Sequence, residues 1–328
     1  MGRLLLFACV IASAQTWQMQ ESGTTASLRG VSAVTAKIAW TSGTKGTILR
    51  TIDGGSRWEN VSPAGTSDLD FRDIEAISDR VAFAMSAGDG RGSRVYKTTD
   101  GGATWTMLRA NQDPAGFWDA IAMWDATHGI LLGDPVDGRF TIFLANDGLA
   151  WTQIEGPKAE NGETAFAASG TALIVQGARG AWFATGGPGG GRVFHSEDSG
   201  KSWSFARTPI KPSSDGSGIF SVATSGSRMA VVGGDYTKPK DMHSNIALGE
   251  NGKWTTPPGG PLGYRSAVVY LPAQKAWVAV GTSGSDSSTD NGEAWRSFDD
   301  HPFNAVSVAK DGAAWAAGPD GRIGKLLF

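Results

Sequence analysis

Three arginines give this sequence its clearest potential for chemistry. Arg29, Arg72 and Arg265 each follow a large apolar residue in three similar segments, and two further segments align Trp118 and Asn304 with them. Planar guanidinium groups form paired hydrogen bonds with carboxylates and phosphates. If the five positions meet in space, they predict a binding site for a carboxylate, a phosphate or an acidic peptide.

Carboxylates accompany these positions. Asp73 and Asp119 directly follow two of them, and a short polar loop carries Asp134 and Arg139. Loops held by a rigid scaffold are where binding residues concentrate, so we include all four in the predicted site. A structural interpretation stays open, in which each arginine stacks on the preceding aromatic ring and pairs with a local aspartate.

A repeated element must position these side chains. Seven short apolar segments each run into a glycine, and the glycines are spaced 37 to 53 residues apart: Gly43, Gly88, Gly133, Gly186, Gly233, Gly281 and Gly318. Four-stranded propeller blades repeat at about 40–50 residues. We therefore predict an all-β fold, a seven-bladed β-propeller of four-stranded antiparallel blades, as one domain over residues 15–328.

A second motif supports the repeat. The pattern Ser/Thr-x-Asp-x-Gly-x-Ser/Thr-Trp is complete at 98–105 and 196–203, has one mismatch at 51–58 and 288–295, is shortened at 146–151 and has decayed at 249–254. Aspartate and glycine favour a hairpin turn. We predict structural roles, on the face opposite the arginines, for Asp53, Trp58, Asp100, Trp105, Asp147, Trp151, Asp198, Trp203, Asp290 and Trp295.

The turn motif is the Asp box, and the chain resembles the BNR/Asp-box β-propeller families. With its segments 29–32 and 98–105 it looks most like the Ycf48/Hcf136 group of photosystem II assembly factors and their bacterial relatives. The resemblance implies a propeller that binds a partner without catalysis, through an arginine-lined surface.

The two ends of the chain are predicted to pair. The last repeat lacks a Trp-headed fourth strand, while residues 16–19 (TWQM) resemble residues 104–107 (TWTM). We predict that Trp17 begins the missing strand and closes the last blade, which removes a free sheet edge. A loose N-terminal arm is the alternative.

Residues 1–14 are typical of an export signal. Arg3 is followed by the apolar stretch 4–12 and a small-residue cleavage pattern at 12–14. This predicts a periplasmic or secreted protein. The single cysteine, Cys9, lies inside the signal, so the mature protein would have no disulfide. Residues 6–9 also resemble a lipoprotein box, although the apolar run before them is short.

Net charge and composition limit the classes of partner that we expect. The formal net charge of −3 favours neither nucleic acid nor an anionic lipid surface. No stretch after the signal approaches the roughly 20 apolar residues that span a bilayer, so any membrane contact would be peripheral. The four histidines have no paired spacing. We predict no metal, no cofactor and a monomer.

Three functional hypotheses follow. The first is a non-enzymatic protein that binds a protein partner, or a small acidic or carbohydrate ligand, at the arginine-lined mouth. The second is a sialidase-like glycoside hydrolase, since three arginines can grip a sugar carboxylate and Glu75 could assist. It is weakened by the missing Phe-Arg-Ile-Pro motif and the count of seven blades rather than six. The third is kinship with relatives labelled oxidoreductases, for which no cofactor motif is visible.

Overall fold

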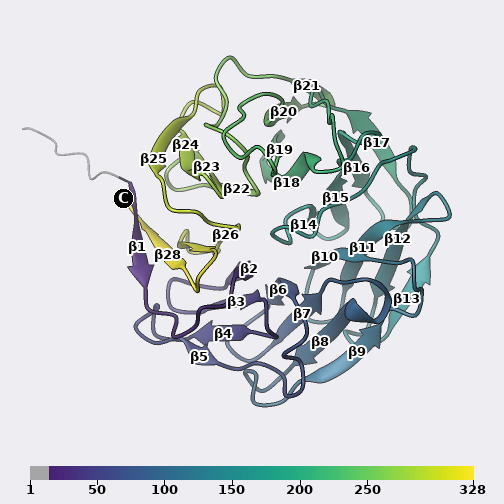
Figure 1. The fold of residues 1–328 in the computed structure, drawn as a ribbon, viewed down its shortest axis with the longest axis vertical. Coiled ribbons are helices and arrows are strands. Elements are labelled where there is room, and N and C mark those ends of the chain that lie inside the picture. Colours follow the sequence, from purple (N-terminus) through teal and green to yellow (C-terminus); the bar gives the residue numbers. More distant parts are fainter. Residues whose placement is uncertain (1–14) are drawn as a thin grey trace, which may run out of the picture.

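The apolar segments of the repeat form the inner strands of seven antiparallel β-sheets arranged around one axis (Figure 1). The structure is a computed structural model that describes residues 15–328. The predicted signal peptide and Cys9 lie outside the described residues. Every blade has four strands, which confirms the seven-bladed fold predicted from the repeat.

The strands are ordered from the axis outward. The innermost strands, from blade one to blade seven, are β2 (Leu28–Ala33), β6 (Phe71–Ala76), β10 (Trp118–Met123), β14 (Leu173–Gln176), β18 (Ser217–Ser225), β22 (Ala267–Leu271) and β26 (Ala305–Val308). The second strands are β3 (Ala39–Gly43), β7 (Ala82–Ser86), β11 (Gly129–Val136), β15 (Gly180–Ala184), β19 (Arg228–Asp235), β23 (Ala276–Gly281) and β27 (Ala314–Ala317). The third strands are β4 (Ile48–Thr51), β8 (Arg94–Thr98), β12 (Arg139–Ala145), β16 (Arg192–Ser196), β20 (Ile246–Glu250), β24 (Gly284–Ser288) and β28 (Ile323–Leu327). The outermost strands are β5 (Glu59–Asn60), β9 (Thr106–Ala110), β13 (Trp151–Ile154), β17 (Ser204–Arg207), β21 (Lys253–Thr255), β25 (Arg296–Asp299) and β1 (Thr16–Gln20).

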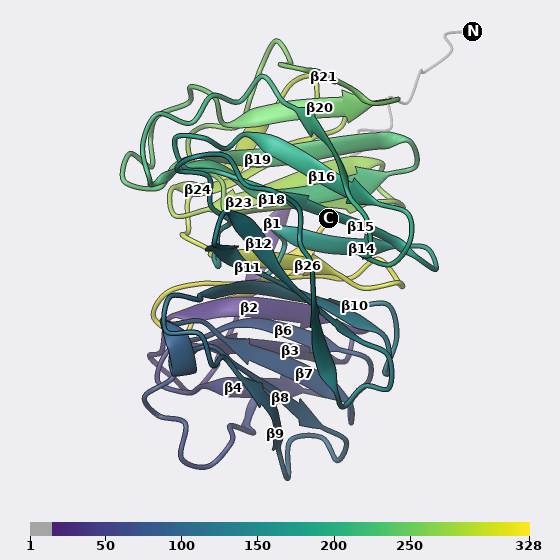
Figure 2. The same cartoon turned by 90° about the vertical axis from the view of Figure 1, so that its right-hand side faces the viewer.

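Loops lie on the two faces of the disc, which Figure 2 shows edge-on. One short 3-10 helix, Gly90–Gly92, interrupts the loop between β7 and β8. Among residues 15–328, no helix is long and apolar enough to cross a membrane.

The core consists of the junctions between blades. Within the described chain, seven clusters of buried apolar side chains each join two neighbouring blades. The inner strands are apolar on both faces because each sheet is covered by a blade on either side. Burial of these side chains is the main stabilising term of the ring.

The outer turns are built by aspartate. In the turn after β4, the Asp53 carboxylate accepts hydrogen bonds from the Thr51 hydroxyl at 2.9 Å and the Arg57 N–H at 3.0 Å. Asp100, Asp198 and Asp290 make the same pair of contacts. In the shorter turn of blade three, the Asp147 carboxylate accepts the N–H groups of Leu149 and Ala150, both at 2.8 Å. Hydrogen bonding lowers the pKa of each of these carboxyls.

The tryptophan that follows each such turn packs at the junction with the preceding blade. The Trp58 ring meets Trp315 of blade seven edge-on, and Trp105 meets Trp40 of blade one in the same way. Trp151, Trp203 and Trp295 lie in the corresponding clusters of blades three, four and six. Each ring therefore fixes one blade against the next.

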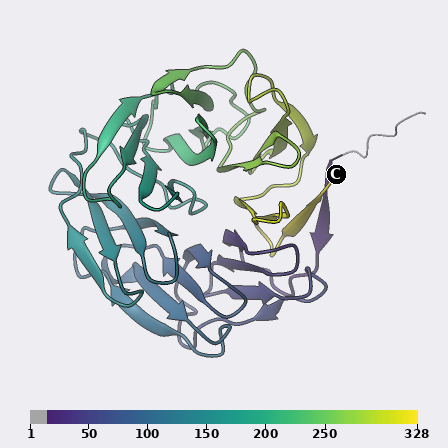
Figure 3. The same ribbon diagram turned by 180° about the vertical axis from the view of Figure 1, so that it is seen from behind.

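The N-terminal strand completes blade seven. β1 pairs with β28 in antiparallel register from Thr16 opposite Leu327 to Gln20 opposite Ile323. Figure 3 shows the purple N-terminal strand beside the yellow C-terminal strand. Trp17 is 5% exposed, packs against Phe298 and Phe303, and donates from its indole N–H to Ser285 of blade six at 3.0 Å. The predicted ring closure is confirmed.

Ring closure by Trp17 can be measured. We expect Trp17→Ala to lower the free energy of unfolding by about 3–5 kcal/mol, since a buried aromatic ring leaves a cavity at the seam. Urea unfolding followed by fluorescence gives the value. Met19→Ala, at a position 41% exposed on the same strand, is the matched control and should change stability little. Equal effects of the two changes would show that the seam is not held by this ring.

Candidate functional site

A cavity of about 710 Å³ opens at one mouth of the central channel. Its wall takes side chains from every blade. They are Arg29, Arg72, Asp119, Phe166, Phe220, Ser266 and Asn304, from blades one to seven in order. The ends of the second strands and the loops that follow them, with Asp134, Gly187, Tyr236 and Thr282, surround it. This is the face opposite the aspartate turns, as the repeat pattern predicted.

A β-bulge aims the inner residues at the axis. In the inner strands of blades one, two, three and five, the register shifts across one extra residue, and that residue is Arg29, Arg72, Asp119 or Phe220. The residue before it points into the blade and is fully or almost fully buried. A bulge re-aims a side chain in this way at sheet ends near functional sites.

The structure corrects the predicted alignment at two positions. Trp118 occupies the inward-packing position of blade three, is fully buried and packs against Phe143, while the next residue, Asp119, faces the cavity. In blade six, Arg265 takes the packing position and Ser266 lines the cavity. The alignment of Trp118 and Arg265 with Arg29 was therefore wrong by one residue.

Arg265 is instead an internal ion-pair partner. It is 1% exposed, and its Nε donates to the Asp286 carboxylate at 2.6 Å. One terminal nitrogen donates to Ser283 and to the Tyr264 carbonyl, both at 2.8 Å. With its donors occupied inside blade six, Arg265 presents no charge to the mouth.

Arg29 is the opposite case. Its side chain is half-buried at the cavity wall, and no salt bridge or side-chain hydrogen bond satisfies it within residues 15–328. Its Nε is shielded from solvent and has no acceptor. Burial, followed by the nearby Arg72 charge, lowers the pKa of this guanidinium. A guanidinium stays protonated in proteins, so Arg29 is an incompletely paired cation.

Arg72 is held in place. Its Nε donates to the Asp70 carboxylate at 2.8 Å, and a terminal nitrogen donates to the Ala167 carbonyl of blade four at 3.1 Å. Asn304 is likewise engaged, since its amide donates to the Leu28 carbonyl at 2.7 Å across the seam between blades seven and one. These two residues shape the cavity wall.

Burial raises the pKa of three carboxyls at or below the mouth, Asp73, Asp119 and Asp134. Burial raises the pKa of Asp73 to about 7. Burial also raises the pKa of Asp119 well above its ordinary range, with a further contribution from the Asp134 charge, and burial raises the pKa of Asp134.

Asp73 lies below the cavity rather than in its wall. It is 3% exposed, and its carboxylate accepts the Ile121 N–H of blade three at 2.8 Å. Arg139 also lies outside the cavity, where it donates to the Gly156 carbonyl at 2.9 Å and pairs with Glu155 at 2.6 Å. Of the predicted binding residues, the cavity collects Arg29, Arg72, Asp119, Asp134 and Asn304.

Residues 162–170 form the floor, and sequence reasoning missed them. This segment precedes β14 and reaches blade two through Ala167 and blade six through Ser169, whose hydroxyl donates to the Ser266 carbonyl at 2.9 Å. A Cβ on Gly170 would lie 2.2 Å from an Asp73 carboxylate oxygen. The segment therefore lies across the channel and closes the cavity from below.

A buried ion pair anchors the floor. Glu163 and Arg192 are 5% and 3% exposed, and the Arg192 Nε donates to the Glu163 carboxylate at 2.8 Å. The Thr185 hydroxyl donates to the same oxygen at 2.7 Å. The floor is also tied to blade three, because the Ala165 N–H donates to Asp134 at 3.0 Å.

An aromatic wall faces the cationic side. Phe166 stacks on Phe220 with ring centroids 3.9 Å apart and an interplanar angle of 3°. Phe220 also meets Tyr264 edge-on at 4.8 Å and lies 6.3 Å from Tyr236. Such a wall suits apolar side chains or a flat ligand group. Phe220 follows the buried Ile219 in blade five in the same way that Arg29 follows the buried Leu28 in blade one. The alignment of strand starts made from the sequence did not include blade five.

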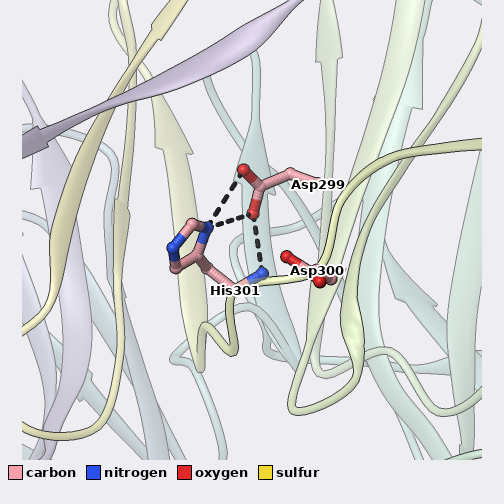
Figure 4. A group of neighbouring side chains, drawn as sticks. All are labelled: Asp299, Asp300 and His301. Atoms are coloured by element: carbon pink, nitrogen blue, oxygen red, sulfur yellow. Dashed lines mark hydrogen bonds and ion pairs between the residues drawn. The ribbon is translucent and has the colours of Figure 1, made fainter.

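One small cluster elsewhere has metal-binding residue types. In the described part of the chain, Asp299, Asp300 and His301 place ligand atoms within 4.8 Å of one another (Figure 4). The His301 ring and N–H already bond Asp299, at 3.1 Å and 2.8 Å, on an exposed turn. These contacts describe a local turn, and we assign no metal to it.

The fold and cavity define a seven-bladed β-propeller with a cationic and aromatic pocket at one mouth. Residues 10–117, which include β1 to β9, match the sequence model of the photosystem II assembly factor YCF48 family. Over this first third of the chain the sequence is similar to that family, in agreement with the Ycf48-like resemblance read from the sequence. No curated protein sequence matches it.

Solved structures share the fold across almost the whole chain. YCF48 bound to a D1 peptide is 15% identical with a TM-score of 0.66, and the match covers 95% of this chain and 97% of that one. YCF48 from Cyanidioschyzon merolae is 14% identical with a TM-score of 0.69, covering 95% and 98%. A streptogramin B lyase is 12% identical with a TM-score of 0.70, covering 96% and 98%. The last match shows that an enzyme can share this fold, so function must be argued from the cavity.

The two arginines of blades one and six allow a matched test. We expect Arg265→Ala to lower the free energy of unfolding by about 3–5 kcal/mol, because Asp286 is left buried without its cation. Arg29→Ala should change it by less than about 1 kcal/mol, because no paired carboxylate is stranded. Chemical unfolding of the two variants measures both changes in the free energy of unfolding. Equal losses would contradict the assignment of Arg265 as structural and Arg29 as free.

Proposed function

We propose that this protein is a non-catalytic binding protein that holds an acidic segment of a partner protein in the mouth cavity. The observation that carries the proposal is Arg29, a half-buried cation whose Nε has no acceptor within residues 15–328. A buried donor without a partner is costly, and a carboxylate is the group that satisfies a guanidinium best. A bound acidic side chain or chain end would supply it.

A peptide fits the cavity better than an inorganic anion. The wall opposite Arg29 is aromatic, with Phe166, Phe220 and Tyr236 available to apolar side chains beside the acidic group. The volume of about 710 Å³ lies within the range of specific ligand pockets. The solved complex of YCF48 with a D1 peptide supports a protein partner, because that relative shares the fold.

A glycoside hydrolase of the sialidase kind finds less support. Its arginine triad would require Arg265, which is buried and paired with Asp286. Of the two tyrosines that line the cavity, Tyr264 is buried, and burial raises the pKa of its hydroxyl, which opposes formation of a nucleophilic phenolate. Turnover of an aryl sialoside that is lost in Glu75→Gln would contradict the binding role.

We further propose that the protein works after export, in the periplasm or outside the cell. The support is the sequence of residues 1–14, with its basic residue, apolar run and small-residue cleavage pattern. An acidic segment presented by an exported or membrane-bound partner would be within reach there.

The binding role is tested with selected peptides. We expect random ten-residue peptides selected on the mature protein to be enriched in Asp and Glu. Arg29→Ala should weaken the best peptide about tenfold to a hundredfold, the loss expected for a charge-assisted hydrogen bond. Fluorescence anisotropy measures the affinity.

Arg139→Ala is the control, since Arg139 lies outside the cavity and should leave binding unchanged. Selected peptides that lack carboxylates, or that bind Arg29→Ala as tightly as the unaltered protein, would overturn the proposal.

A further inference from the structure

A second cavity lies where one aspartate turn has decayed. In blades four and six, the aspartate turn between the third and fourth strands has its full length, and the glycine of this turn packs on the preceding blade. Gly200 lies beside Ile130 of blade three, and Gly292 lies beside Leu248 of blade five. Blade five instead joins β20 to β21 by a two-residue turn, in which Asn251 and Gly252 have φ of 51° and 77°. This shorter turn leaves the junction between blades four and five unfilled.

The gap is a groove of about 420 Å³. It lies on the face opposite the mouth, because its rim is formed by the ends of β14 and β20 and by the turn between β18 and β19. Figure 1 shows blades four and five, β14–β17 and β18–β21, as neighbours in the ring. The groove and the mouth cavity share no residue.

Blade four supplies an aromatic platform. Trp182 and His195 are opposite one another on β15 and β16, and their rings stack with centroids 3.5 Å apart at 8°. The residue opposite His195 on β17 is Ser204. Its small side chain leaves the second face of the imidazole open to a ligand.

Blade five supplies the facing ring. Trp254 lies against Gly249, where a Cβ would meet the indole ring at 2.9 Å. Trp254 is half-buried, and no hydrogen bond occupies its indole N–H within residues 15–328. Met229, which is 7% exposed, lies in the lining between the two aromatic walls.

The remaining lining is mixed, with Val193, Phe205 and Ala206 as its apolar side chains. It contains hydroxyl and amide side chains, which both donate and accept hydrogen bonds: Gln176, Ser204, Thr224, Ser227 and Asn251. The carboxylate of the lining, Glu250, is paired with Arg228 at 3.4 Å. Burial lowers the pKa of His195, so its imidazole is neutral at neutral pH. Among residues 15–328, the groove lining therefore has no charged side chain without a partner.

We propose that this groove binds a neutral sugar ring of a glycan. Flat aromatic faces pack against the C–H face of a hexose, and surrounding hydroxyl and amide groups satisfy its hydroxyls. A proline-rich peptide would also stack on the rings, but it has too few hydrogen-bond donors to use five donor and acceptor side chains. The site is independent of the binding role proposed for the mouth.

The test uses four probes: maltohexaose, cellohexaose, laminarihexaose and chitohexaose, titrated into the mature protein and followed by indole N–H resonances. We expect at least one to bind with a dissociation constant below about 1 mM and to shift the Trp254 and Trp182 signals. Trp254→Ala should weaken that probe about tenfold or more. Ser204→Phe, at an exposed position, should cover the imidazole face and abolish binding while the protein stays folded.

Tyr236→Ala is the control, because it removes an exposed aromatic ring at the opposite mouth and should leave sugar affinity unchanged. The proposal fails if none of the four probes binds, if binding survives both groove variants, or if decaproline binds the groove more tightly than every hexasaccharide. Peptide binding at the mouth should persist in Ser204→Phe, so failure here leaves the first proposal standing.

Discussion

The structure depends on the packing of a tryptophan from each outer turn against the preceding blade. A ring of separate sheets has no covalent closure, so each junction must bury enough apolar surface to hold its neighbours in place. Trp17 serves the last junction, and its partner Phe303 precedes Asn304, whose amide bonds the Leu28 carbonyl across the seam. Closure at the rim is thus connected to the shape of the mouth.

The mouth combines rigid positioning with an uncompensated charge. Bulges at the starts of the inner strands turn Arg29 and Arg72 toward the axis, and the segment 162–170 closes the channel beneath them. Arg72 is paired with Asp70, while Arg29 is not paired. The cavity therefore has a side formed by two arginines opposite an aromatic wall, and burial raises the pKa of the nearby Asp119 and Asp134. In the proposed binding role, such a site would need little rearrangement to accept an acidic group.

The repeated blades and turns could be predicted from the sequence, whereas the floor segment and the register of the inner strands could not. The glycine spacing and the aspartate turns gave seven blades, and the likeness of residues 16–19 to 104–107 gave the closing strand. The face that carries the mouth was predicted, but in two blades the residue that faces the cavity was not. Phe117 and Trp118 are adjacent large residues, as are Tyr264 and Arg265. The sequence therefore offers two alignments in each blade, and only the folded strand shows which residue packs into the blade. The floor has no repeat to reveal it, because Glu163 and Arg192 are 29 residues apart and pair only in the folded ring.

In the proposed function, the Arg29 guanidinium is the group that receives a ligand carboxylate. A crystal structure of the mature protein with a selected acidic peptide examines this directly. We expect a peptide carboxylate oxygen within hydrogen-bonding distance of Arg29, with a neighbouring side chain against Phe220. A peptide seated on the outer rim, or one in the mouth whose carboxylates all point away from Arg29, would contradict it.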